Sequence, residues 1–339
     1  MKNFKSKNGS LLIAEIGGNH EGNFDYAKKL TKLAIDSKVD VIKFQIYKAD
    51  TLVSKSESPS RNKHFRAFEL SKSQHVYLAE MVKESGIKYS SSVWDIDALD
   101  WLDKFIDIYK IGSGDLTAYP ILKETCKTGK PMIISTGLAS EAEVVETVKY
   151  IQRSNCRYEQ KDYLGILQCT TMYPIPFEDA NLNVIKRFRE IFDATIGYSD
   201  HTEGSKALKY AHALGAEILE FHFTDTRTDK EFRDHKVSLT KSDVLDLIKE
   251  MELINKLKGH QTKKPLKIEI DNGHDKSFRR AVYPSKDIKN GELLSDQNLT
   301  VLRPLSGVDA RSYYDLMGKV AAKDFKTHEK INRDDFRHD

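Results

Sequence analysis

The first 260 residues repeat one pattern: a short apolar run, a polar or glycine-containing turn, and then an amphipathic stretch. Strands that alternate with helices in this way are parallel strands. Eight such units in about 250 residues have the number and size of a closed α/β barrel, the (β/α)₈ TIM barrel. The apolar runs that we interpret as its strands are 11–16, 40–46, 88–93, 108–111, 131–135, 164–169, 194–198 and 218–223.

The stretches between the runs have apolar residues at helical spacing, and Gly86 and Gly129 stand where helices end. The predicted helices are 24–38, 76–85, 121–128, 141–152, 182–192, 203–214 and 242–257. A doubly wound open sheet is the alternative, but its first turn usually carries a GxGxxG pattern. Here that turn reads Gly17-Gly18-Asn19-His20, so we predict the barrel.

The pattern breaks after Gly259. We interpret 1–260 as the barrel, the polar stretch 261–278 as a linker, and 279–339 as a small β-rich domain. Short strand-like pieces at 281–283, 299–302 and 319–322 support the last assignment. About 60 residues make a marginal core, so we expect this domain to pack on a barrel, its own or a partner's.

The composition excludes several classes of function. The chain has 54 basic and 51 acidic residues, scattered rather than gathered in a stripe, so nucleic-acid binding is not indicated. No apolar run is long enough to cross a membrane, and no apolar signal core precedes the first strand. Three widely spaced cysteines suit a reducing compartment, and we predict a cytoplasmic protein.

Two histidines end the seventh and eighth predicted strands. In a TIM barrel, residues that follow the strands converge on one face, where the active site lies. His201 and His222 would therefore share a rim. Neutral imidazole is a common metal ligand, although a partly buried histidine often binds nothing. The pair is a candidate site for a divalent cation: we favour Mn²⁺, with Mg²⁺ or Co²⁺ as alternatives to a dedicated zinc cage.

Charged residues also stand inside apolar runs. Glu15 and Lys43 are each flanked by apolar neighbours, and an unpaired buried charge is costly, so both indicate a site. Lys110 is either a site residue or an exposed strand terminus. Lysines with hydroxyl groups bind phosphate or carboxylate, although such hydroxyls also cap helices.

These residues lie in motifs that resemble those of the sialic acid (nonulosonate) synthases over almost the whole chain. The motifs are Ala14-Glu15-Ile16-Gly17-Gly18-Asn19-His20, Lys43-Phe44-Gln45, Lys110-Ile111-Gly112-Ser113-Gly114-Asp115, Ser135-Thr136-Gly137, Tyr173-Pro174, Ser199-Asp200-His201-Thr202 and His222-Phe223-Thr224. The tail resembles the family's antifreeze-like (SAF) domain, with Arg279-Arg280 and Leu302-Arg303-Pro304.

The resemblance implies a transferase of sialic acid biosynthesis for surface polysaccharides. It would condense phosphoenolpyruvate (PEP) with the open-chain aldehyde of an N-acylated hexosamine, giving a nine-carbon 2-keto acid and phosphate. The implied metal ligands are His201 and His222, and Glu15 and Asp115 are the acid/base candidates. The implied PEP-binding residues are Lys43, Ser92, Lys110, Ser113 and Ser135. The implied sugar-facing residues are Gln45, Thr171, Tyr173 and Asp234.

The resemblance also implies a domain-swapped homodimer, in which Arg303 reaches into the barrel of the other subunit and binds the acyl end of the sugar. Thr171 stands where the family often has Asn, and Leu305 where Gly is common. The resemblance therefore does not determine which sugar is the substrate. It is N-acetylmannosamine, its 6-phosphate, or a 6-deoxy-diacetamido hexose.

Three alternatives remain at this stage. A barrel aldolase would use Lys43 or Lys110 as a Schiff-base nucleophile. Other PEP-dependent 3-deoxy-keto-acid synthases share the chemistry but lack the SAF tail. A non-catalytic sugar-binding barrel would bind metal and PEP without turnover.

Overall fold

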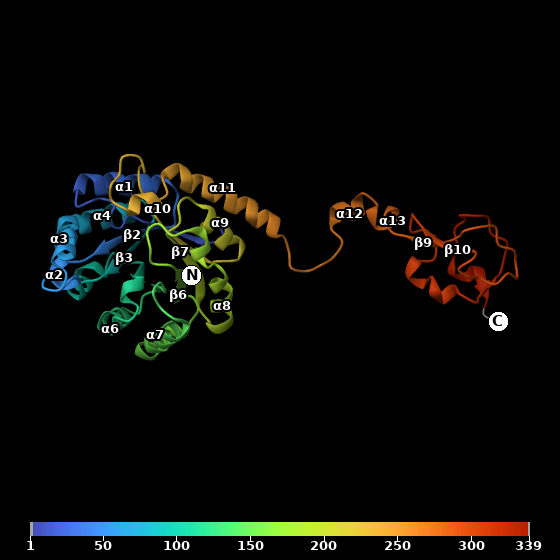
Figure 1. The fold of residues 1–339 in the computed structure, drawn as a ribbon, viewed down its shortest axis with the longest axis horizontal. Coiled ribbons are helices and arrows are strands. Elements are labelled where there is room, and N and C mark those ends of the chain that lie inside the picture. The colour runs from blue at the N-terminus through green and yellow to red at the C-terminus, as the bar shows by residue number, and fades with distance from the viewer. Residues whose placement is uncertain (1–2, 338–339) are drawn as a thin grey trace. The chain divides into compact units, whose positions relative to one another are not determined.

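The computed structural model describes residues 3–337. The chain divides into two compact units, Met1–Gly259 and His260–Asp339 (Figure 1). Each unit has its own hydrophobic core and is described by itself. Among residues 3–337, no helix combines the length and the apolar composition that crossing a bilayer requires.

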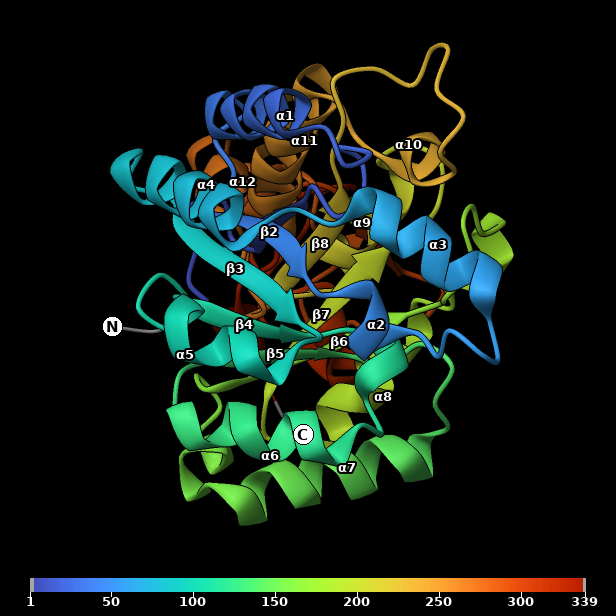
Figure 2. The ribbon, with the colours of Figure 1, turned by 90° about the vertical axis from the view of Figure 1, so that its left-hand side faces the viewer.

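The first unit is a closed barrel of eight parallel strands, each paired with the next and the eighth with the first. Figure 2 shows the strands at the centre, with α1, α4, α6 and α7 outside them. The predicted TIM barrel is confirmed. Its strands are β1 (Leu11–Glu15), β2 (Val41–Ile46), β3 (Lys88–Val93), β4 (Ile108–Ile111), β5 (Met132–Ser135), β6 (Leu164–Cys169), β7 (Thr195–Asp200) and β8 (Ile218–His222).

The helices of this unit surround the strands. They are α1 (Phe24–Asp36), α2 (Ala49–Leu52), α3 (Pro59–Phe68), α4 (Lys72–Glu84), α5 (Leu99–Leu102), α6 (Tyr119–Thr128), α7 (Glu141–Ser154), α8 (Asn183–Ile191), α9 (Lys206–Ala213), α10 (Asp234–Val237) and α11 (Lys241–Lys258). The predictions missed α2, α3 and the single-turn helices α5 and α10. The reason is physical: α3 buries only the polar Asn62, so it has no apolar stripe to reveal it.

Helix starts are set by polar caps that precede the apolar stripe. Ser71 accepts a hydrogen bond from the Gln74 backbone N–H, and the Gln74 side chain accepts one from the backbone N–H of Ser71. This capping box starts α4 at residue 72, four residues before the predicted start at 76. Ser140 forms the same box with Glu143 at the start of α7.

Alternation along the strands divides the barrel interior into two layers. Apolar side chains from β1, β2, β4, β5, β6 and β8 pack with Phe4 in one interior cluster: Leu11, Ile13, Val41, Ile108, Ile133, Leu167 and Ile218. Side chains repeat on one face every second residue of a strand. The next inward positions are therefore Glu15, Lys43, Lys110, Ser135, Cys169 and Glu220. An apolar floor thus supports a polar layer at the carboxyl ends of the strands.

The second unit has a small core of its own, including Val282, Leu299 and Phe325. Strands β9 (Ala281–Pro284) and β10 (Leu299–Leu302) pair antiparallel, as do β11 (Val320–Ala321) and β12 (Phe336–Arg337). The β-rich character predicted for the tail is confirmed. The predicted linker is not featureless, because it contains the short helices α12 (Lys267–Asp271) and α13 (His274–Ser277).

Candidate active site

Strand register brings distant charged residues together. Glu15 on β1 is the register partner of Lys43 on β2 and of His222 on β8. Ser92 on β3 is paired with Gln45 on one side and Lys110 on the other. All of these side chains except Gln45 are buried. The predicted rim residues therefore converge because the barrel closes.

Two lysines and two carboxylates form a buried network (Glu15, Lys43, Lys110 and Glu220). Lys43 contacts Glu15, and Lys110 Nζ lies 3.1 Å from Glu220 Oε1. The same Glu220 oxygen is 3.9 Å from Lys43 Nζ, so this carboxylate bridges the two ammonium groups. Buried charges are tolerated when they are paired, and these four balance two against two.

The network shifts the ionisation of its members. Burial lowers the pKa of Lys43 to about 7, against the opposing effect of the Glu220 charge. Burial also opposes ionisation of Glu220, but the charges of Lys110 and Lys43 outweigh it and hold its pKa below the usual value. Glu220 therefore stays a carboxylate and serves as counter-ion to both lysines.

Glu220 is the site residue that the sequence predictions missed. It lies within the apolar run Ile218-Leu219-Glu220-Phe221, the same setting that singled out Glu15 and Lys43. The cost of an unpaired buried charge would have identified it by the same argument.

Hydroxyl groups gather beside the network around Gly137. The backbone N–H of Gly137 donates to Ser113 Oγ at 3.1 Å. A Cβ at Gly137 would lie 2.2 Å from Thr171 Oγ1, so that hydroxyl also faces this backbone. The hydroxyls of Ser135 and Thr171 are buried without a hydrogen-bond partner. We call Ser113, Ser135, Thr171 and the Gly137 backbone the hydroxyl cradle, a donor set suited to an anion.

Asp115 stands on the turn that follows β4, beside Lys110. Burial raises its pKa to about 6, against the opposing charge of Lys110. A carboxyl group with a pKa in this range can exchange a proton near neutral pH. The structure thus brings both acid/base candidates, Glu15 and Asp115, to the same rim.

The rings of His201 and His222 lie 5.4 Å apart. His201 Nδ1 is 2.7 Å from the Thr170 carbonyl oxygen. A carbonyl can only accept, so Nδ1 carries the proton and Nε2 keeps its lone pair for a ligand. Burial lowers the pKa of both histidines, which keeps the imidazoles neutral.

The donor set of the histidine pair fits a divalent cation. His222 Nδ1 is buried without a hydrogen-bond partner and is 3.8 Å from Asp234 Oδ2. Within residues 3–337, no three His, Cys, Asp or Glu side chains are arranged to hold a metal ion. The protein would therefore supply the two imidazoles, leaving other positions for water and a substrate oxygen.

Arg303 belongs to the second unit, where its guanidinium lies 5.1 Å from the centre of the Phe278 ring. Its side chain is exposed. The predicted role of Arg303 in the barrel of another subunit stays a prediction.

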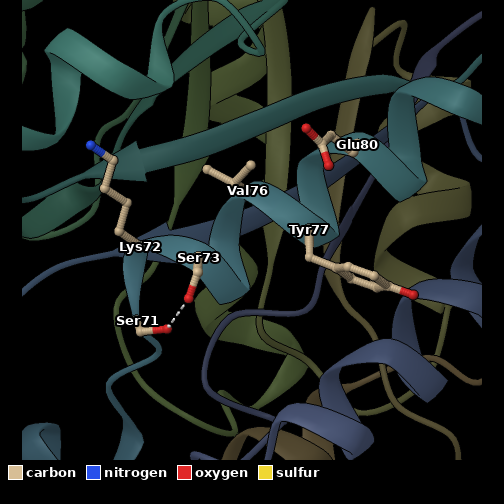
Figure 3. A pocket seen from close by; sticks show the side chains of 6 residues that line it. All are labelled: Ser71, Lys72, Ser73, Val76, Tyr77 and Glu80. Atoms are coloured by element: carbon tan, nitrogen blue, oxygen red, sulfur yellow. Dashed lines mark hydrogen bonds between the residues drawn. The ribbon is translucent and has the colours of Figure 1, made fainter.

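A hollow lies along α4 (Figure 3). It has a volume of about 590 Å³ and is lined by Ser71, Lys72, Ser73, Val76, Tyr77 and Glu80. Ser71 is engaged in capping α4, and none of the rim residues lines this hollow. The barrel rim is therefore the candidate active site.

Comparison with known families agrees with this geometry. Residues 30–263 match the model of the NeuB family, and residues 279–337 match the SAF domain. The chain belongs to the NeuB family. The resemblance to nonulosonate synthases with a C-terminal SAF domain is confirmed, and this NeuB-family chain is a PEP-condensing transferase.

Relatives of known activity cover nearly the full length. The chain is 35% identical over 337 residues to N,N'-diacetyllegionaminic acid synthase of Campylobacter jejuni (95% of this chain, 98% of the relative). It is 32% identical over 326 residues to human N-acetylneuraminate-9-phosphate synthase (91% and 88%). A solved N-acetylneuraminic acid synthetase of Leptospira borgpetersenii aligns with a TM-score of 0.71 at 29% identity (79% and 91%).

Proposed function

We propose that this chain is a nonulosonate synthase that joins PEP to the open-chain aldehyde of an N-acyl hexosamine, giving a nine-carbon 2-keto acid and phosphate. The observation that carries the proposal is the pair of buried lysines beside the hydroxyl cradle. Such a site suits a small, strongly anionic substrate such as PEP. Lys43 and Lys110 offer point charges, and Ser92, Ser113 and Ser135 offer donors to its oxygens.

His201 Nε2 and His222 would hold the divalent cation, for which Mn²⁺ is our first choice. When bound, that cation supplies Lewis-acid polarisation of the aldehyde oxygen. Gln45, Tyr173 and Asp234 would face the sugar, as would Thr171, which would lie in the hydroxyl cradle between the two substrates. In a homodimer, Arg303 of the other subunit would bind the acyl group of the sugar.

The covalent chemistry forms one C–C bond and one C–O bond, the latter to the oxygen of water, and breaks the C–O bond to phosphate. The aldehyde oxygen takes up a proton and becomes a hydroxyl group. The PEP methylene carbon attacks the aldehyde carbon, and the resulting cationic C2 takes up water. The water loses a proton, and the tetrahedral intermediate expels phosphate. Asp115 is suited to accept that proton because its raised pKa lies near neutrality. Glu15 is the second candidate, although its contact with Lys43 favours a structural role.

One feature favours the Schiff-base alternative, the pKa of Lys43 that burial lowers to about 7, but the contacts of both lysines oppose it. A nucleophilic lysine needs a free, neutral amine. Lys43 and Lys110 are each engaged by a buried carboxylate. Borohydride treatment in the presence of a keto substrate should therefore leave no adduct on either lysine. The cytoplasmic location stays a prediction.

Phosphate release from PEP tests the function directly. The sugars to compare are N-acetylmannosamine, its 6-phosphate and 2,4-diacetamido-2,4,6-trideoxymannose, each with Mn²⁺ and again with a chelator. We expect release with at least one sugar and its loss with the chelator. His222→Ala should abolish turnover, whereas His212→Gln, at the other end of the barrel, should keep it. Silence with all three sugars in the presence of Mn²⁺ would refute the proposal.

A further inference from the structure

The geometry points to Arg233 as a specificity-determining residue that contacts the amino sugar at its end remote from the aldehyde. It would bind a strong acceptor oxygen there, either a phosphate on C6 or the carbonyl of a second acylamino group. This inference rests on the proposed function and names the substrate feature that the site selects.

Arg233 belongs to a stack that begins at the histidine pair. The Tyr173 ring lies 4.0 Å from the His201 ring and meets the His222 ring edge-on at 5.5 Å. The Arg233 guanidinium lies 4.7 Å from the centre of the Tyr173 ring. One aromatic ring therefore separates this cation from the two imidazoles.

The exposure of these side chains gives the stack a direction. The side chains of His222 and Asp234 are only 7% and 10% exposed, whereas that of Arg233 is 66% exposed. A sugar whose aldehyde oxygen lies at the buried histidines must extend outward, past Tyr173, toward Arg233.

The distances match the length of the substrate. The Tyr173 ring is 4.0 Å from the His201 ring and 4.7 Å from the Arg233 guanidinium. Together these two distances set the upper limit on the distance from the His201 ring to the guanidinium. An extended six-carbon chain spans about 6 Å, and a substituent adds to that reach. The guanidinium therefore lies within reach of an oxygen at the far end of the sugar.

The guanidinium keeps donors free for that oxygen. Arg233 Nε lies 3.3 Å from Asp234 Oδ1, and two thirds of the Arg233 side chain is exposed. A guanidinium binds a phosphate through two parallel donors and an amide carbonyl through one or two. Asp234 and the Tyr173 ring hold the group at a fixed place.

Further positive charge lies nearby on α3. The His64 ring is 5.9 Å from that of Phe232, the residue before Arg233. The guanidinium of Arg61, one turn before His64, lies over Phe65 and has no ion pair among residues 3–337. Burial lowers the pKa of His64, and the charges of Arg233 and Arg61 both lower it further, so two cations act on this one ring. Such a pair of guanidinium groups favours an acceptor oxygen over a plain methyl group.

The test compares wild type with Arg233→Gln on the three sugars already named. N-acetylmannosamine has neither a phosphate nor a second acylamino group, so it is the reference. We expect Arg233→Gln to lower kcat/KM about tenfold or more on the 6-phosphate or the diacetamido sugar, relative to its effect on N-acetylmannosamine. The KM for PEP should not change. Arg233→Lys should retain more activity on the phosphate than on the diacetamido sugar, because it keeps the charge without the fork.

Lys230→Gln is the matched control, since Lys230 is a cation of the same loop that lies over Tyr26. It should leave all the ratios unchanged. Equal losses on every sugar, or none, would overturn the inference while phosphate release by wild type still supported the proposed function. Absence of release by wild type would refute the proposed function itself.

Discussion

The carboxylate of Glu220 lies 3.1 Å from the ammonium group of Lys110, and the same oxygen is 3.9 Å from that of Lys43. One acidic side chain therefore contacts both buried cations that the proposed PEP site uses, and Glu15 supplies the second negative charge. Its removal leaves two buried lysines with only Glu15 as counter-ion.

Glu220→Gln should lower the free energy of unfolding by roughly 3 kcal/mol, the usual cost of breaking a buried ion pair from one side. Urea denaturation measures this. Glu217→Gln is the control, because Glu217 forms an exposed pair with Lys161 just before the same strand. A change no larger than that of Glu217→Gln would show that Glu220 is not the counter-ion.

Gly137→Ala should close the hydroxyl cradle. Its new methyl group would lie 2.2 Å from Thr171 Oγ1 and 2.8 Å from Ser113 Oγ, so both hydroxyls must turn away. We expect the KM for PEP to rise about tenfold, as for the loss of one or two hydrogen bonds to an anion. Steady-state kinetics with varied PEP tests this. Gly114→Ala, where a Cβ meets nothing within 4 Å, is the control. Equal KM values for the two variants would exclude the cradle as the anion site.

We expect the acidic limb of the pH profile of kcat/KM to follow the ionisation of Asp115. Its pKa is raised to about 6, so the carboxylate is present above that pH and protonated below it. If it accepts the proton from water, kcat/KM falls about tenfold per pH unit below pH 6. Asp115→Asn should lose at least about 100-fold in activity. Exposed Asp97, changed to Asn, should leave the profile unchanged. An acidic limb that persists in Asp115→Asn would assign it to another group.

A polar network around His212 connects three segments of the chain at the opposite end of the barrel. His212 Nδ1 lies 2.7 Å from Ser10 Oγ, and its Nε2 lies 2.9 Å from Asn255 Oδ1. His212→Ala should lower the free energy of unfolding by about 1–3 kcal/mol, because Asn255 Oδ1 loses its partner and Ser10 keeps only its bond to the Ala216 carbonyl. Thermal or urea unfolding gives this value, and kcat should not change. A loss of kcat with unchanged stability would contradict this structural role.

The architecture was predictable because each βα unit carries its own local pattern. Glu15 and Lys43 could be recognised because charges inside apolar runs are rare, and His201 and His222 because they end successive strands. Glu220 was missed although it carries the same signal. Arg233 gave no signal, because an arginine in a polar loop looks like any solvated cation until Tyr173 is placed beneath it.

The site is built across the closure between β1 and β8, where Glu15 is the register partner of His222. During synthesis, Glu15, Lys43 and Lys110 all emerge before the strand that carries Glu220 and His222. No half-barrel can contain a working site, and the lysines lack their bridging carboxylate until the last strand docks. The rate at which activity recovers during refolding should therefore report the pairing of β1 with β8 that closes the barrel. Circular dichroism would follow the earlier formation of the helices.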